Sequence, residues 1–229
     1  MVEFESAGAR LWARGRKLKM PVRSHRALAL DFGRVLTLEP DQSSYAFLRQ
    51  RFDIPEAAFS QAWNAHRHEY DRGTINTATY WTQILNSCLP DPAKVDLLPL
   101  IEEMADADFA SWNQPRETLH RIVQDALDAK VPAAIVSNMP EGLGDRFVRA
   151  WPWLSRIQYR FFSAEIGLVK PDDAFYHHVL EQTGWSPRSV LFVDDLPANI
   201  QTAARLGFET LLFTGSESDV DQIRSWCRS

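Results

Sequence analysis

The feature that most constrains the fold is a series of four short apolar runs, separated by longer stretches of mixed composition. The runs are nearly continuous, and they read RALALDF (26–32), VPAAIVS (131–137), SVLFVDD (189–195) and ETLLFT (209–214). Continuous apolarity over so few residues is typical of strands that are covered on both faces, as in a parallel sheet. We therefore expect four parallel strands, one at each run.

Amphipathic segments between these runs predict the helices that would connect the strands. Residues 116–130 carry apolar side chains at helical spacing, namely Leu119, Ile122, Val123, Ala126 and Leu127. Residues 173–184 and 197–207 show a similar pattern, and each ends in a glycine, a residue that commonly terminates a helix. The alternation of strands and helices predicts an α/β fold with a doubly wound, Rossmann-like parallel sheet.

A long insertion follows the first apolar run, and it reads as helices only. Its helical candidates are residues 44–52, 55–73, 77–89 and 92–107. We expect an all-helical cap domain over residues 40–112, and an α/β core over residues 26–39 and 113–229. Ligands of such sheets bind at the carboxyl ends of the strands, so a cap inserted there would close over the site and exclude water.

Charge is distributed unevenly along the chain. The net charge is −5, yet residues 1–26 contain seven basic and two acidic side chains, so the remainder is strongly acidic. Residues 1–25 lack the apolar run of a secretory signal, and their early acids weaken the interpretation as a transit peptide. We expect a basic, solvated N-terminal tail, or an upstream extension with Met20 as the alternative start. The acidic balance disfavours nucleic acid as a partner.

Hydropathy and cysteine content bear on where the protein works. No apolar run reaches the ~18 residues that a membrane span requires, so we expect no membrane partner. Cys88 and Cys227 lack the CxxC spacing of a metal or redox site, and two thiols do not make a disulfide framework. A reducing, cytoplasmic setting is the simplest interpretation, and the oligomeric state is left open.

Polar residues follow the predicted strands at the points where the strands end. The residues concerned are Asp31, Ser137, Asn138, Asp194 and Asp195, with Asn199 four residues after Asp195. Lys170 lies in the segment GLVKP, between the second and third apolar runs. Because the carboxyl ends of parallel strands meet at the same edge of a sheet, we expect three carboxylates, one ammonium group and one hydroxyl group there. The alternative is that the acids and Ser137 only cap helices or turns, and that Lys170 is a solvated loop residue.

Three neighbouring carboxylates repel one another and raise each other's pKa. A Mg²⁺ ion removes this problem, because it accepts one or two carboxylates together with water and phosphate oxygens. A lysine and a hydroxyl group can hold the remaining oxygens of a phosphoryl group by charge-assisted hydrogen bonds. Asp31 is then free to attack phosphorus and form an aspartyl-phosphate. The pattern therefore predicts phosphoryl transfer at the sheet edge.

Four segments together resemble the haloacid dehalogenase-like hydrolase superfamily, in the branch with a helical cap after the first strand. They are LALDFGRVLT, AIVSN, GLVKPD and VLFVDDLPANIQTAARLGF, in the family's order, and DRGTINTATYW (71–81) resembles the cap of that branch. The resemblance implies Mg²⁺ as the cofactor. It also implies these candidates: Asp31 as nucleophile and metal ligand, Ser137 and Lys170 with the adjacent Asn138 as substrate ligands, and Asp195 as a metal ligand supported by Asp194.

Gly33 is the point at which the sequence departs from the family's usual pattern. Most phosphatases of this kind carry a second aspartate there, as the general acid for the leaving oxygen, and glycine cannot donate that proton. The resemblance still implies that the backbone carbonyl of Gly33 binds Mg²⁺. Loss of a general acid typically lowers the rate by ~10²–10⁴. The loss matters least for anomeric, acyl or aryl phosphates, whose leaving groups are weak bases, and a group such as a cap histidine could also substitute.

Several aromatic and basic residues of the predicted cap have a simpler interpretation than catalysis. The residues expected on its surface are His66, Arg67, His68 and Tyr70, with the first and last on one helix face. Trp63 and Trp81 are expected to pack between helices, with a place in the wall of a substrate pocket as the alternative.

Three functions fit this sequence, and a Mg²⁺-dependent phosphatase of a small phosphorylated metabolite, such as a sugar phosphate, is favoured. A haloacid dehalogenase or a phosphonatase is the second. A dehalogenase would resemble Ser-x-Asn in place of Asp194 and Asp195, and a phosphonatase needs a cap lysine, for which Lys94 is the only candidate between residues 38 and 112. A non-catalytic binding protein is the third, and the complete set of nucleophile, lysine and metal carboxylates argues against it.

Overall fold

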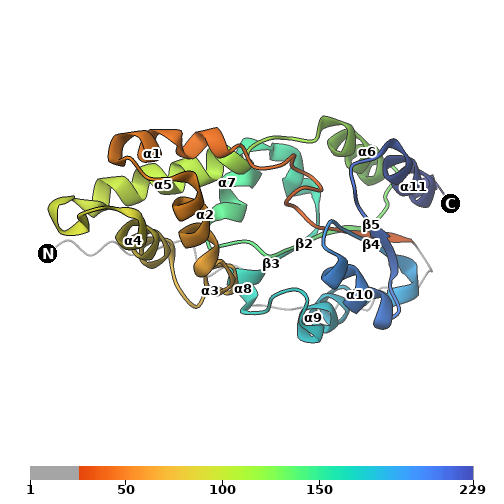
Figure 1. Cartoon of the computed structure of the whole chain (residues 1–229). Coiled ribbons are helices and arrows are strands. Elements are labelled where there is room, and N and C mark those ends of the chain that lie inside the picture. The colour runs from red at the N-terminus through yellow and green to blue at the C-terminus, as the bar shows by residue number, and fades with distance from the viewer. Residues whose placement is uncertain (1–25, 229) are drawn as a thin grey trace, which may run out of the picture.

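The computed structural model describes residues 26–228, and a five-stranded parallel sheet forms their centre (Figure 1). The strands are β1 (Ala27–Leu30), β2 (Ala133–Ser137), β3 (Tyr159–Phe162), β4 (Val190–Asp194) and β5 (Glu209–Leu212). Their order across the sheet is β3-β2-β1-β4-β5, and every pair is parallel. The predicted α/β fold with a doubly wound sheet is confirmed. The prediction of a basic tail at residues 1–25 lies outside the described residues.

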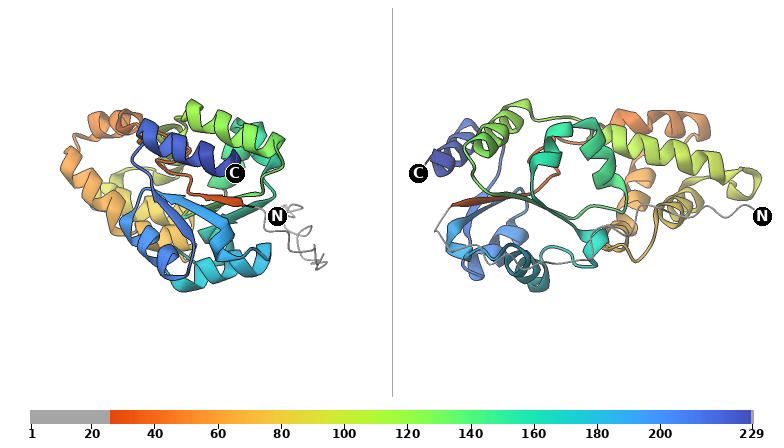
Figure 2. Two further views of the ribbon diagram at one scale, coloured as in Figure 1. Left: turned by 90° about the vertical axis from the view of Figure 1, so that its right-hand side faces the viewer. Right: turned by 180° about the vertical axis from the view of Figure 1, so that it is seen from behind.

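Helices cover both faces of the sheet, which explains why its central strands are apolar without alternation (Figures 1 and 2). They are α6 (Glu117–Asp128), α7 (Leu143–Ala150), α8 (Ser163–Ile166), α9 (Asp173–Thr183), α10 (Pro197–Arg205) and α11 (Glu217–Arg228). Leu28 and Leu30 of β1 pack with side chains of α6, α7 and α11, whereas Ala27 and Ala29 pack with α9 and α10. The central strand is therefore buried on both sides.

Strand β3 is the element of the sheet that the apolar runs do not predict. It has only four residues, and Tyr159 and Arg160 are half-buried, so the strand carries no continuous apolar signal. It pairs with β2 alone and forms one edge of the sheet. Edge position explains the tolerance of an arginine in this strand.

The insertion after β1 is entirely helical over the residues that form regular structure. Its helices are α1 (Ala46–Phe52), α2 (Glu56–Ala65), α3 (Arg67–Arg72), α4 (Thr77–Cys88) and α5 (Leu97–Trp112), with short 3-10 turns at Gln42–Tyr45 and Pro92–Lys94. They enclose a second apolar core, in which Trp81 is fully buried and Trp63 packs at the margin. The packing role predicted for both tryptophans is confirmed.

Two details of the insertion differ from the prediction. The helix expected over residues 55–73 is broken at His66, whose backbone leaves the helical region, so that α2 and α3 are separate. Tyr70 is buried rather than exposed, because its ring stacks on Tyr80 with 4.1 Å between centroids. The surface position expected for Tyr70 is therefore wrong, and the short helix α3 turns its side chain into the insertion's core.

Two antiparallel segments join the helical insertion to the sheet. The Leu38 amide donates to the carbonyl of Gln114 at 2.7 Å, and Thr37 and Pro115 form a β-bridge. On the other side, α3 packs on α8, which directly follows β3. The insertion thus extends from the carboxyl-end side of the sheet (Figures 1 and 2).

No helix in residues 26–228 is both long enough and apolar enough to cross a membrane.

Candidate active site

The ends of three neighbouring strands bring the predicted polar residues to one edge of the sheet. Asp31 directly follows β1, while Ser137 ends β2 and Asp194 ends β4. The register places Leu30 beside Ile135 on one side and Val193 on the other, and the Asp31 amide donates to the Val193 carbonyl at 2.9 Å. Asp31, Ser137 and Asp194 are all buried at this edge.

Lys170 connects two of these carboxylates. Its Nζ lies 2.9 Å from Asp31 Oδ1 and 2.6 Å from Asp194 Oδ2, and its side chain is almost completely buried. The backbone of Lys170 is fixed by Asn138, whose Oδ1 accepts from the Lys170 amide at 2.8 Å and whose Nδ2 donates to its carbonyl at 2.9 Å. Asn138 thereby holds the lysine loop against the end of β2.

Asp194 is held more rigidly than the other two acids. Asn199 Nδ2 donates to both of its oxygens, at 2.9 and 3.0 Å, and the Leu196 amide donates to Oδ1 at 2.9 Å. Asn199 is at the start of α10, and its side chain is buried. These donors fix the orientation of the carboxylate, a function that the sequence alone does not assign to Asn199.

Asp31, Asp194 and Asp195 each present one oxygen within 4.8 Å of the others. Burial raises the pKa of Asp31 to about 7, with Lys170 lowering it and Asp194 raising it further. Burial and Asp194 also raise the pKa of Asp195. A bound cation would oppose these shifts, because it stabilises the ionised carboxylates.

This set of donors fits Mg²⁺, which prefers carboxylate, carbonyl and water oxygens. Asp31 and Asp195 are the carboxylates least restrained by hydrogen bonds at this edge, and the Gly33 carbonyl follows Asp31 in the same loop. Lys170 offers a second positive charge within the same group of acids. The edge can therefore hold a metal ion and the oxygens of an anionic ligand together.

Packing against a tryptophan gives a reason for glycine at residue 33, which the sequence does not reveal. A Cβ atom at this position would lie 3.2 Å from Cζ3 of Trp112, the last residue of α5. Contacts this short require the neighbouring side chain to shift. A side chain at residue 33 would therefore require the Trp112 ring to move by a few tenths of an ångström.

Arg34 is a site residue that sequence reasoning missed. It adopts a left-handed backbone with φ of 59°, which is rare for a residue with a side chain. Its Nη1 lies 3.5 Å from Asp195 Oδ2, and its Nε donates to Glu39 at 2.8 Å. In the sequence, the sign that Arg34 belongs to the site is that it directly follows Gly33, in the loop that begins at Asp31. The Arg34 amide donates to Thr37 Oγ1 at 2.9 Å. This hydrogen bond stabilises the left-handed turn that directs the Arg34 side chain.

The histidines of the insertion have partners of their own. His66 Nδ1 lies 3.1 Å from Glu69 Oε2, and His68 Nε2 lies 3.4 Å from Arg72 Nη2. Both histidines are at least partly exposed, as expected for surface residues.

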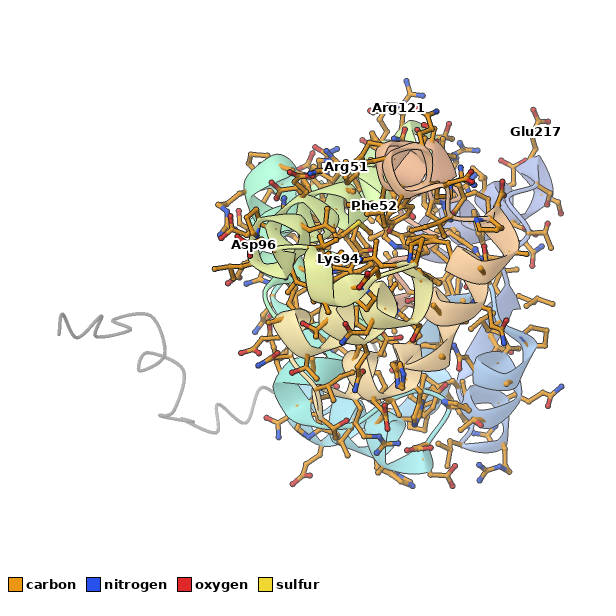
Figure 3. All side chains as sticks on the ribbon, turned by 60° about the vertical axis from the view of Figure 1, so that its left-hand side comes forward. Arg51, Phe52, Lys94, Asp96, Arg121 and Glu217 are labelled. Carbon is orange, nitrogen blue, oxygen red and sulfur yellow. The ribbon has the colours of Figure 1, made fainter. Side chains whose placement is uncertain are left out.

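Two hollows of about 390 and 350 Å³ lie at the outer end of the insertion, away from the strand ends. Both are lined by Arg51, Phe52, Lys94 and Val95, and Figure 3 views the molecule with this end forward. None of the strand-end residues contributes to either hollow. The hollows are thus separate from the candidate site.

Three curated proteins resemble parts of the chain. Flavin mononucleotide hydrolase 1 of Arabidopsis thaliana is 34% identical over 62 residues, which are 27% of this chain and 25% of that protein. A sesquiterpene phosphatase of Aspergillus oryzae is 39% identical over 64 residues, 28% of this chain and 33% of that protein. A drimenol cyclase of Aspergillus calidoustus is 28% identical over 191 residues, 82% of this chain and 34% of that protein. The chain therefore spans about a third or less of each relative's length.

Solved structures resemble the fold over most of the chain. A HAD-like hydrolase from Porphyromonas gingivalis has a TM-score of 0.71 at 21% identity, with 90% of this chain and all of that chain covered. A HAD enzyme from Bacteroides thetaiotaomicron, in complex with magnesium and inorganic phosphate, has a TM-score of 0.66 at 20% identity, covering 84% and 96%. The L-2-haloacid dehalogenase of Xanthobacter autotrophicus has a TM-score of 0.61 at 18% identity, covering 81% and 76%.

At identities of 21% or less, these structures show the fold alone, and the family rests on the sequence. The sequence pattern described as haloacid dehalogenase-like hydrolase matches residues 25–207. The chain thus belongs to the haloacid dehalogenase-like hydrolases.

Proposed function

We propose that this protein is a Mg²⁺-dependent phosphatase of a small phosphorylated metabolite, and that it acts through an aspartyl-phosphate. One observation carries the proposal: a buried lysine pairs with two of three carboxylates that lie within 4.8 Å of one another. With Mg²⁺ bound by the carboxylates, the ion and the lysine together would balance the charge of a phosphoryl dianion, and Asp31 would still offer a carboxylate oxygen as a nucleophile.

In this proposal Asp31 attacks phosphorus, so that a bond forms between its carboxylate oxygen and phosphorus while the bond to the leaving oxygen breaks. Water then attacks phosphorus, releases inorganic phosphate and restores the carboxylate. Lys170 and the Ser137 hydroxyl bind phosphoryl oxygens, and Asn138 fixes the lysine loop beside them. Asp31, Asp195 and the Gly33 carbonyl would hold Mg²⁺, with Asp194 in support. When bound, this ion supplies positive charge to the phosphoryl oxygens.

The leaving group receives no proton from residue 33, because glycine has none to donate. We therefore propose substrates whose leaving groups are weak bases, such as sugar phosphates with an anomeric phosphate. Two relatives, a flavin mononucleotide hydrolase and a sesquiterpene phosphatase, are hydrolases named for phosphorylated organic substrates or for phosphatase activity, and they support this reaction class.

Two further predictions complete the proposal. Residues 40–112 act as a cap that excludes water from the strand-end site, with residues 26–39 and 113–229 as the core, and Trp112 is the residue of this cap that packs against Gly33. We also place the protein in the cytoplasm, since its thiols at residues 88 and 227 are free rather than disulfide-bonded.

Two alternative reactions of the family are less well supported by the site. A phosphonatase would need a lysine of the cap that reaches the strand ends, but Lys94 is exposed at the outer end of the insertion, where it pairs with Asp91. A dehalogenase needs no metal ion. Its reaction therefore gives no reason for Asp194 and Asp195 to lie beside Asp31, whereas a bound cation does.

The test is hydrolysis of para-nitrophenyl phosphate with Mg²⁺ and with a chelator, by the wild-type protein and by Asp31→Asn. We expect turnover that requires both Mg²⁺ and Asp31. Turnover that is unchanged by chelation would remove the metal from the mechanism. Dehalogenation of 2-chloropropionate in place of phosphate release would establish the alternative reaction.

A further inference from the structure

The end of helix α3 carries the sequence Asp71-Arg72-Gly73, to which the proposed reaction gives no role. These residues begin the stretch DRGTINTATYW (71–81), which resembles the cap of the family. Helix α3 packs against α8 of the core, at the junction between the insertion and the sheet (Figure 1). Because each of the three residues contacts a residue of the core, we call residues 71–73 the clasp.

The first contact of the clasp leads to the end of β2, where Ser137 and Asn138 lie. The carbonyl of Asp71 accepts a hydrogen bond from the Ser163 hydroxyl. The same hydroxyl oxygen accepts from the Met139 amide at 2.8 Å, and Met139 directly follows Asn138. The clasp is therefore connected, through one serine, to the segment that carries two of the proposed substrate ligands.

Gly73 allows the clasp to approach the core this closely. Its φ is 77°, in the left-handed region that favours glycine. A Cβ atom at this position would lie 2.7 Å from the carbonyl oxygen of Ala164, which belongs to the backbone and cannot turn aside as a flexible side chain could. A side chain at residue 73 would therefore push the helix end away from Ala164 and from the neighbouring Ser163.

The third contact leads to the loop that carries Lys170. Arg72 Nη2 donates to Asp172 Oδ2 at 2.9 Å, and Asp172 is two residues beyond Lys170. Asp172 is also the N-cap residue of α9, where an aspartate side chain usually accepts from the first backbone amides of the helix. Here the side chain makes no capping hydrogen bond. Its carboxylate pairs with the insertion instead.

Stability gives little reason for the Arg72–Asp172 ion pair. The two side chains are 32% and 49% exposed, and ion pairs at such positions contribute little to the free energy of unfolding. A capping hydrogen bond from Asp172 would commonly stabilise α9 by as much or more. The ion pair is therefore better explained by the loop that it positions.

The two core segments that the clasp contacts are also joined to each other. Asn138 accepts from the Lys170 amide at 2.8 Å and donates to its carbonyl at 2.9 Å. Lys170 Nζ in turn lies 2.9 Å from Asp31 Oδ1. Small displacements of groups that bind a reacting phosphate reduce the rate strongly, so the support of this lysine matters for catalysis. The clasp holds the lysine loop from the side of the insertion.

We propose that Arg72 is a positioning residue for the phosphoryl site. Its ion pair with Asp172 fixes the Lys170 loop, so that the lysine takes its full part in binding phosphoryl oxygens only when the insertion is packed on the core. The inference rests on the proposed phosphatase function and adds to it a residue that acts through Lys170.

The first experiment compares Arg72→Met with Arg205→Met. Arg205 pairs with Asp173, the next residue of the chain, but it lies on α10 of the core and its side chain is also partly exposed. The measured quantities are kcat/KM for para-nitrophenyl phosphate and the inhibition constant of inorganic phosphate, both with Mg²⁺. We expect Arg72→Met to lower kcat/KM and to weaken phosphate binding, each by about tenfold, and Arg205→Met to stay within about twofold of the wild type.

Urea unfolding separates positioning from a general loss of structure. The unfolding midpoints of Arg72→Met and Arg205→Met should be alike, because each variant loses one exposed ion pair. Wild-type values of kcat/KM and of the phosphate inhibition constant in Arg72→Met would overturn the inference.

The second experiment reverses the ion pair. Arg72→Asp and Asp172→Arg each place like charges side by side, and the double variant restores an ion pair of opposite polarity. We expect each single change to lower kcat/KM by about tenfold or more, and the double variant to recover most of this loss. A double variant whose loss equals the product of the two single losses would show that the contact does not position the loop, and would overturn the inference.

The outcomes separate this inference from the proposed function. If Asp31-dependent hydrolysis of para-nitrophenyl phosphate is observed and Arg72→Met behaves like Arg205→Met, the phosphatase stands and the positioning role falls. If the wild-type protein releases no phosphate, the proposed function itself is wrong, and the positioning role falls with it.

Discussion

The molecule contains two buried groups of charges, and they are built in different ways. At the strand ends, the chain positions Asp31 and Asp194 through backbone pairing in the sheet, and Asn199 and a backbone amide hold the Asp194 carboxylate. In the insertion, Arg67 pairs with Asp71 inside helix α3, and Asp108 of helix α5 accepts a hydrogen bond from the Tyr45 hydroxyl. The first group is therefore fixed by the fold, and the second depends on how the insertion's helices pack.

This difference suggests a division of labour between the two groups. A reacting carboxylate must stay within a fraction of an ångström of its productive position, and rigid elements provide that. Substitutions at the strand ends should hence affect all substrates, whereas substitutions among the buried charges of the insertion should act mainly through the packing of its helices.

The largest expected effect comes from a matched pair of amide substitutions, Asp31→Asn and Asp71→Asn. Asp31→Asn should lower kcat by roughly 10⁴-fold or more with every phosphate ester, because the amide is a poor nucleophile. Asp71→Asn should leave kcat much closer to the wild-type value, because Asp71 pairs with Arg67 and is not one of the strand-end residues. Steady-state kinetics with aryl and sugar phosphates measures both, and circular dichroism checks the fold. Wild-type activity in Asp31→Asn would mean that Asp31 is not the nucleophile.

The next effect concerns stability and tests the buried lysine. Lys170→Met leaves Asp31 and Asp194 without their shared partner, so in chelator the free energy of unfolding should fall by about 3–5 kcal/mol. Added Mg²⁺ should restore part of this loss, since a ligand that binds the folded state stabilises it. Urea unfolding measures the change, with Lys130→Met at an exposed position as the control. Equal stability of Lys170→Met and the wild type would show that the ion pairs are not formed.

A smaller effect is expected at the contact between the insertion and the nucleophile loop. Gly33→Asp should destabilise the protein by about 1–3 kcal/mol, because its Cβ would press on the Trp112 ring. Trp112→Leu should relieve that pressure, so the double variant should unfold at a higher urea concentration than the sum of the single changes predicts. Strictly additive changes would mean that Trp112 does not fill the space beside residue 33.

The smallest effect is a pH dependence at the junction of insertion and core. His120 Nε2 lies 2.9 Å from the Leu36 carbonyl, and burial lowers the pKa of this histidine. The unfolded chain then binds a proton at a higher pH than the folded chain, so stability falls as the pH decreases through the ordinary histidine value of about 6.5. His120→Gln does not titrate, and its stability should change less between about pH 7.5 and about pH 5.5. An identical pH dependence of the two proteins would contradict this assignment.

The strand-end group could be predicted from the sequence because each residue directly follows an apolar run. The positions of Asp31 and Asp194 could be predicted from the rule that parallel strands align their carboxyl ends. Lys170 needed the family resemblance, since its loop belongs to no apolar run. The strand β3 was missed because it is short, and the half-buried Tyr159 and Arg160 interrupt its apolar character.

The buried charges of the insertion, Arg67, Asp71 and Asp108, could not be predicted, because no periodic signal in the sequence marks them as buried. Arg67 was expected on the surface, but the helix breaks at His66 and the Arg67 side chain is mostly buried beside Asp71. Such a break depends on how α2 and α3 pack on α4, which no local pattern encodes. The left-handed turn at Arg34 was missed for a related reason, since arginine rarely adopts it.

The most direct test of the account is to trap the intermediate on Asp31. The protein is mixed with para-nitrophenyl phosphate and Mg²⁺, quenched rapidly, and treated with borohydride, which reduces an aspartyl-phosphate to homoserine. Peptide mass spectrometry should then find homoserine at residue 31, in an amount that follows the burst of nitrophenolate, and none in Asp31→Asn. A stoichiometric burst with residue 31 unmodified, or with the phosphoryl group on another side chain, would contradict the account.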